Sequence, residues 1–64
     1  MKNNIEKIRK EKGLLQEEFA KIIGVSRQTI SSLETGKYNP SISLAYKIAK
    51  YFEMTIEEVF IFDE

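Results

Sequence analysis

The run RQTISS, near the middle of the chain, combines side chains that can form hydrogen bonds with the edges of nucleic-acid bases. Arg27 has the paired donors that fit guanine O6 and N7. Gln28 has the donor and acceptor that fit adenine N6 and N7, and Ser31 and Ser32 can bond either base. The alternative is a merely polar, solvent-facing surface. In a chain with 31% charged residues, however, an ordinary exposed face would more often carry Lys and Glu. The residue types therefore predict contact with base edges.

Other kinds of site chemistry are poorly supported by the composition. Among 64 residues there is no histidine and no cysteine, the residues most used as metal ligands, general bases and thiol nucleophiles. An enzyme would need a carboxylate pair or a Ser-Lys dyad in a domain too small for a sizeable pocket. We therefore expect no enzymatic activity, no metal site, no cofactor and no small-molecule ligand. The charged start of the chain and the lack of a long apolar run indicate a cytoplasmic protein with no membrane partner.

Five short helices are expected to position the polar run, because apolar residues recur at helical spacing. Their sequences are NNIEKIRKEKG, QEEFAKII, SRQTISSLETG, SISLAYKIAKYF and TIEE. In the third segment Ile30 and Leu33 mark the buried side, so the polar run points away from the core. Between the second and third segments Gly24 permits the positive φ of a sharp turn, and Ala20 is small enough for close helix crossing.

The end of the chain follows a different pattern. Residues 59–64 read VFIFDE, with four consecutive apolar residues of β-branched and aromatic type. Such residues favour an extended strand over a helix. A strand needs a partner, and the only spare polypeptide is the N-terminal MKNN. The sequence therefore predicts a short terminal β-pair between residues 1–4 and residues 59–63.

The stretch QEEFAKIIGVSRQTISSLETGKYNP, residues 16–40, resembles the Cro/CI-type helix-turn-helix family, which includes lambda-repressor-like and xenobiotic-response-element regulators. The flanking segments fit the same fold, so the resemblance covers nearly the whole chain. It implies an all-α, five-helix, lambda-repressor-like DNA-binding domain at residues 1–64, with the helix-turn-helix at residues 16–35. It also implies sequence-specific binding of double-stranded DNA through the helix 27–35, usually by a homodimer on a pseudo-palindromic operator. A transcriptional repressor is favoured over an activator.

The resemblance also implies roles for individual residues. Family positions matching Arg27, Gln28 and Ser32 reach bases, and Ser31 lies close enough to share that task. Phosphate contacts fix the register of a protein on DNA without reading sequence. The predicted phosphate-binding residues are Gln16, Thr29, Lys37, Tyr38, Asn39 and Arg9. For each of them the alternative is an ordinary polar residue on the surface.

Two further expectations concern residues that support the helix pair. Counterparts of Arg9 and Glu34 form a salt bridge in several relatives, and Glu34 is expected on the buried side of its helix, where a charge needs a partner. Two unrelated surface charges are the alternative. The family usually places Ser or Thr where Leu15 stands, so a side-chain cap paired with Glu18 is lost, at a cost of about 1 kcal/mol. A hydrophobic staple is another role for Leu15.

Charge and apolar residues also divide along the chain. Residues 1–50 carry all ten Lys and Arg against five Glu, whereas residues 51–64 carry five acids and no cation. A neutral chain can thus present a cationic face to DNA. Residues 51–62 are the candidate dimerisation region, because they hold many large apolar groups. The expected interface residues are Ile56, Val59, Phe60, Ile61 and Phe62, unless these complete the core of the monomer.

A rival function remains open at this point. The same fold can serve as a protein-interaction or antitoxin-like module that does not read bases. Arg27 and Gln28 argue against that function, because neither is acidic. An acidic residue at these positions would repel DNA and would favour the protein-interaction module.

Overall fold

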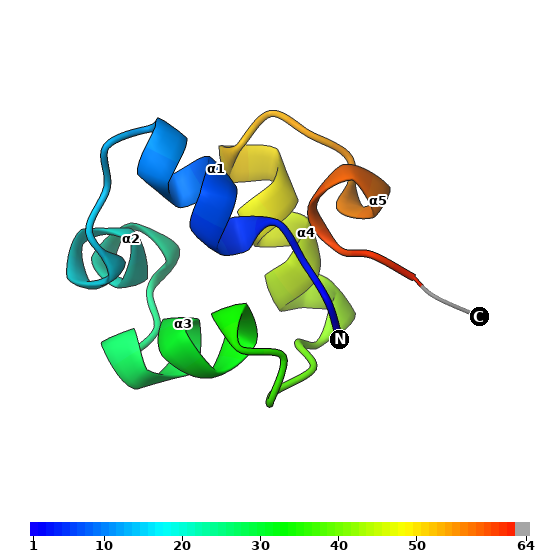
Figure 1. The fold of residues 1–64 in the computed structure, drawn as a ribbon, viewed down its shortest axis with the longest axis horizontal. Helices are drawn as coiled ribbons and strands as arrows, with labels where there is room; N and C mark the ends of the chain where they lie inside the picture. The colour runs from blue at the N-terminus through cyan, green and yellow to red at the C-terminus, as the bar shows by residue number, and fades with distance from the viewer. Residues whose placement is uncertain (63–64) are drawn as a thin grey trace.

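Five helices make up the regular secondary structure of residues 1–62, the part of the chain that the computed structural model describes. They are α1 (Ile5–Glu11), α2 (Gln16–Ile23), α3 (Arg27–Glu34), α4 (Ile42–Tyr51) and α5 (Ile56–Val59). In Figure 1, α3 runs along the bottom of the molecule, α2 lies at the left, and α4 and α5 lie at the right. The predicted all-α, five-helix fold is confirmed.

The core is built from apolar side chains contributed by all five helices. Its buried members are Ile5, Ile8, Phe19, Ala20, Ile23, Ile30, Leu33, Ala45, Ile48, Ala49, Phe52, Val59 and Phe60. The rings of Phe19 and Phe52 stack at its centre, 5.1 Å apart and 6° from parallel. Ile30 and Leu33 have no exposed surface. The burial of these two residues fixes which face of α3 points outward.

The turn between α2 and α3 is as short as the sequence predicts. Gly24 has a φ of 89°, the left-handed conformation that glycine adopts without steric cost. Two residues later, the Ser26 hydroxyl accepts a hydrogen bond from the amide of Thr29 at 3.1 Å and starts α3. Gly24 therefore ends one helix and Ser26 begins the next.

The start of α2 has only half of a capping box. The Glu18 carboxylate accepts a hydrogen bond from the Leu15 amide at 2.8 Å, but the Leu15 side chain, being a hydrocarbon, gives nothing in return. The proposed staple role of Leu15 is wrong, because this side chain is 67% exposed. Leu14 is the residue that packs against the core at this point.

The two ends of the chain do meet, but through a single antiparallel bridge between Asn3 and Phe60. It is flanked by hydrogen bonds from the Asn4 amide to the Val59 carbonyl, at 2.7 Å, and from the Ile61 amide to the Lys2 carbonyl, at 2.9 Å. The expected pair with residues 59–63 is thus shorter than predicted, because Val59 still belongs to α5. Residue 63 lies outside the described residues.

Candidate nucleic-acid interface

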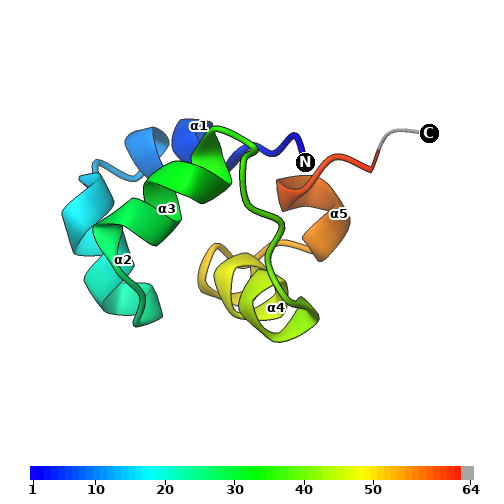
Figure 2. The same ribbon diagram turned by 90° about the horizontal axis from the view of Figure 1, so that it is seen from below.

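The polar side of α3 points away from the core. Arg27 and Gln28 are exposed, and Ser31 and Ser32 are half-buried. Figure 2 views the molecule from the side on which α3 lies. The four residues expected to read bases therefore share the outer side of one helix, which Ile30 anchors from within.

The loop after α3 returns beside this face. The amides of Lys37 and Tyr38 donate hydrogen bonds to the Ser32 carbonyl at 3.0 and 3.2 Å. A shallow hollow of about 270 Å³ is lined by Ser26, Gln28, Thr29, Ser32 and Tyr38. Candidate phosphate-binding residues are thus brought next to candidate base-reading residues, an adjacency that DNA binding requires.

The expected ion pair between Arg9 and Glu34 is present and buried. The Arg9 Nε donates to Glu34 Oε2 at 2.7 Å, and the two side chains are 7% and 3% exposed. A second guanidinium nitrogen donates to Glu34 Oε1 at 3.3 Å, and the third donates to the Leu14 carbonyl at 2.7 Å. These bonds compensate for the cost of burying both charges and tie α1 to the end of α3.

The same geometry corrects one expectation about Arg9. Its three guanidinium nitrogens all donate to acceptors inside the molecule, and the residue is 6% exposed. Arg9 therefore has almost no surface to offer a phosphate. We retain it as a structural residue of the α1–α3 contact and not as a DNA contact.

Gln16 connects the buried ion pair to the exposed Arg27 through two hydrogen bonds. Its Nε2 donates to Glu34 Oε1 at 2.9 Å, and its Oε1 accepts from Arg27 Nη1 at 3.2 Å. The sequence does not predict this contact, because the two residues lie 11 positions apart on opposite sides of a turn. The contact depends on the crossing of α2 and α3, for which a pattern within either helix gives no signal.

The other candidate phosphate-binding residues differ in their surroundings. Lys37 and Tyr38 are exposed. The half-buried Thr29 has its hydroxyl 2.9 Å from that of Ser26, and the Oδ1 of Asn39 accepts from the Met1 ammonium group at 3.2 Å. Lys37, Tyr38 and Asn39 are thus exposed, and of these three Asn39 already bonds the chain's own N-terminus.

The candidate interface residues divide between core and surface. Val59 and Phe60 are 0% and 1% exposed, so they fill the core of this chain and have no surface to offer a second copy. Ile56 is half-buried, whereas Ile61 and Phe62 are 38% and 59% exposed. Of the five expected interface residues, only Ile61 and Phe62 are therefore exposed enough to contact a second copy, together with part of Ile56.

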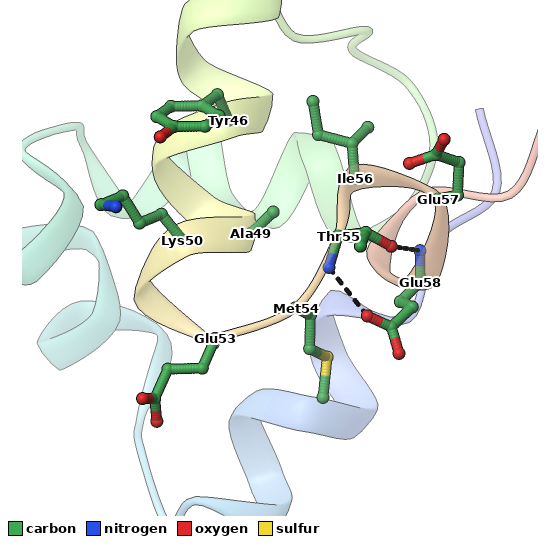
Figure 3. A pocket seen from close by; sticks show the side chains of 9 residues that line it. All are labelled: Tyr46, Ala49, Lys50, Glu53, Met54, Thr55, Ile56, Glu57 and Glu58. Atoms are coloured by element: carbon green, nitrogen blue, oxygen red, sulfur yellow. Dashed lines mark hydrogen bonds between the residues drawn. The ribbon is translucent and has the colours of Figure 1, made fainter.

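An open groove of about 590 Å³ lies between α4 and α5, away from α3 (Figures 1 and 3). Its rim carries Glu53, Glu57 and Glu58, and its walls include Tyr46 and Ile56. Figure 3 shows the Thr55 amide and hydroxyl bonded to Glu58, which together form a capping box at the start of α5. None of the residues expected to contact DNA lines this groove.

Residues 1–62 contain no cluster of three or more acidic side chains that could hold a metal ion. None of the helices in this part of the chain is long and apolar enough to cross a membrane.

Comparisons with known proteins agree with the architecture of α2, the tight turn and α3. The family model described as "Helix-turn-helix" matches residues 5–59. An uncharacterized HTH-type transcriptional regulator of Archaeoglobus fulgidus is 55% identical over the whole chain, which spans 91% of that relative. A similar regulator of Methanocaldococcus jannaschii is 52% identical, again over the whole chain and 97% of the relative.

A solved structure leads to the same conclusion. The crystal structure of a hypothetical transcription factor from Neisseria aligns with a TM-score of 0.76 and 29% identity, covering 86% of this chain and 63% of that one. The chain belongs to the helix-turn-helix family of DNA-binding transcriptional regulators. Because these regulators are not enzymes, the expectation of a non-enzymatic protein is confirmed.

Proposed function

We propose that the chain binds double-stranded DNA sequence-specifically by inserting α3 into the major groove. The observation that carries this proposal is the polar, acid-free side of α3, which is held outward by the burial of Ile30 and Leu33. Arg27 and Gln28 stand exposed at its N-terminal end, the end that meets bases in helix-turn-helix docking. Arg27, Gln28, Ser31 and Ser32 are the proposed base-reading residues.

Phosphate contacts would fix the orientation of α3 in the groove. Lys37 and Tyr38 are proposed to contact one strand beyond the C-terminal end of α3, since both are exposed there. Gln16, Thr29 and Asn39 remain proposed contacts, each with a hydrogen-bonding group beyond those that it uses internally. Such contacts strengthen binding to every sequence alike.

We further propose that the protein acts as a homodimer on a two-fold operator, and that it represses transcription. The exposed side chains of Ile61 and Phe62 border a hollow of about 390 Å³ that they share with Met1 and Lys2. This surface lies beside the C-terminal end of α3, because the Met1 ammonium group donates to the Gly36 carbonyl. Pairing there would place two recognition helices side by side, as dimers that bind half-sites about 34 Å apart require.

The decisive experiment is selection of bound duplexes from a random pool, followed by affinity measurements on the selected site. We expect Arg27→Ala and Gln28→Ala each to relax preference at one or two base pairs, and to cost about 1–3 kcal/mol there. Lys37→Ala is the control. It should weaken all duplexes alike and make the salt dependence shallower. If both alanine variants keep the parental preference, or if the pool yields no preferred site, α3 does not read bases. The protein-interaction module would then be the better proposal.

A further inference from the structure

Asn3 joins the start of α1 to two parts of the molecule that are distant in sequence, the end of α3 and Phe60. Its Nδ2 donates to the carbonyl of Leu33, in the last turn of α3, at 2.7 Å. Its Oδ1 accepts from the amide of Ile5, at the start of α1, at 3.1 Å. Its backbone forms the bridge to Phe60. The Asn3 carboxamide thus links the end of α3 to the start of α1, while its backbone pairs with Phe60.

The Leu33 carbonyl, in the last turn of α3, accepts from the Gly36 amide at 3.1 Å, and the Asn3 side chain supplies a second donor. The final carbonyls of a helix lack partners within the helix, and a donor from outside stabilises them. The last turn of α3 contains no basic side chain that could act in this way. The next turn also packs closely against the N-terminal residues, because a Cβ added at Gly36 would lie 3.2 Å from the Met1 carbonyl oxygen.

This turn determines where the proposed phosphate-binding residues lie. Lys37 and Tyr38 follow Leu33 by four and five residues, and their amides are bonded to the Ser32 carbonyl of the same turn. A shift of the turn would therefore displace both side chains relative to the base-reading end of α3. A rigid, correctly placed contact contributes more to binding than a mobile one, since less ordering is needed when DNA binds.

We propose that Asn3 is a positioning residue for DNA binding, whose carboxamide holds the Leu33–Tyr38 segment in register with the rest of the DNA-facing surface. This inference rests on the proposed function, and it assigns Asn3 no contact with DNA. It predicts that loss of the Asn3 donor weakens the phosphate contacts and leaves base preference unchanged.

The test compares Asn3→Asp with Asn4→Asp in the full chain. Aspartate at position 3 keeps an acceptor for the Ile5 amide but cannot donate to the Leu33 carbonyl. Asn4 is a matched control, because it is a neighbouring, half-buried amide that donates to the Glu58 carbonyl in α5 at 3.2 Å. The two substitutions add the same charge at adjacent positions, but a carboxylate at position 3 would lie closer to α3 than one at position 4. Asn3→Ser and Asn4→Ser repeat the comparison without added charge.

We expect Asn3→Asp to bind the selected duplex about fivefold more weakly than Asn4→Asp does, the usual effect of one lost hydrogen bond. Its salt dependence should be shallower by up to about 0.9 in log–log slope, the value for one phosphate contact. A variant that is merely less stable would lose active protein but keep the wild-type slope. Hydrogen exchange at the amides of Gly36 and Lys37 should be faster in Asn3→Asp without DNA, and unchanged in Asn4→Asp.

Equal affinity, slope and exchange in the Asn3 and Asn4 variants would overturn the inference. The inference would also be overturned if hydrogen exchange were faster in Asn3→Asp while its duplex affinity and salt-dependence slope equalled those of Asn4→Asp. If the wild-type chain selects no preferred duplex, the proposed function fails and the role of Asn3 in DNA binding fails with it. A wild-type preference that both variants retain with equal strength refutes the role of Asn3 alone.

Discussion

Gln16 has two hydrogen-bonding ends, and the structure uses both. Its amide nitrogen can only donate and meets the acceptor Glu34 Oε1, while its oxygen can only accept and meets the donor Arg27 Nη1. Both contacts require the same orientation of the carboxamide. Glu34 therefore determines which atom of Gln16 faces Arg27, and the buried ion pair influences the conformation of an exposed arginine.

This arrangement predicts energetic coupling between Gln16 and Arg27 in DNA binding. In a double-mutant cycle on the selected duplex, Gln16→Ala and Arg27→Ala should together cost less than the sum of their separate effects. We expect a difference of about 0.5–1.5 kcal/mol, the net value of one hydrogen bond. The control cycle combines Gln16→Ala with Gln28→Ala, whose effects on the free energy of binding should add. Additivity within about 0.3 kcal/mol in the test cycle would mean that the Gln16 contact does not persist on DNA.

The sequence shows individual residues of the candidate site better than it shows the contacts between them. Helical periodicity alone places Arg27 and Gln28 on the outer side of α3, because Ile30 and Leu33 determine the buried side. The contact with Gln16 depends on how α2 crosses α3, which no pattern within one helix encodes. The Leu14 carbonyl, which accepts a hydrogen bond from Arg9, is hidden from the sequence for the same reason.

At the scale of elements, the end of α4 has an unusual backbone. Glu53 has a φ of 59°, a left-handed conformation that a residue with a Cβ adopts at a cost. The amides of Glu53 and Met54 donate to the carbonyls of Lys50 and Ala49, which closes the helix in the way that glycine usually does. The native residue at this position is therefore not the most stable choice.

We expect Glu53→Gly to increase the free energy of unfolding by about 0.5–1 kcal/mol, because relief of the left-handed strain exceeds the entropy that glycine adds to the unfolded chain. Denaturant-induced unfolding followed by circular dichroism measures this change. The matched control is Glu17→Gly, an exposed position in the first turn of α2. There the same substitution should destabilise by roughly 0.5–1 kcal/mol. If Glu53→Gly and Glu17→Gly changed the free energy of unfolding by the same amount and in the same direction, the Glu53 backbone would be unstrained.

The starts of the elements could be predicted with more success than their ends. Ser26, Ser41 and Thr55 each cap a helix as their side-chain chemistry indicates. The run after Val59 is different, because its apolar residues are compatible with a strand, a helix end or a core segment. Tertiary packing decides among these: Phe60 is buried in the core and bridges to Asn3, while Ile61 and Phe62 are exposed.

For the whole molecule, the exposed apolar end of the chain predicts a test of self-association. Phe62→Asp should give a folded monomer, because a 59% exposed side chain leaves the core intact when it is replaced. Phe60→Asp should instead unfold the chain, since it would bury a charge in the core. Sedimentation and circular dichroism together distinguish the two results. A monomeric wild-type chain would rule out self-association. A Phe62→Asp variant that still dimerises would place the interface elsewhere on the molecule.

Three of the five acids in residues 51–64 also lie together in space. Glu53, Glu57 and Glu58 gather around the connection between α4 and α5, which lies across the molecule from α3 (Figure 1). A local excess of acids at one end of a neutral body makes that body an electric dipole, and the field around DNA, itself a polyanionic helix, exerts a torque on it. Protein molecules diffusing toward DNA would therefore turn so that the acidic end points away from it. A larger fraction of collisions with DNA would then begin with α3 facing the duplex.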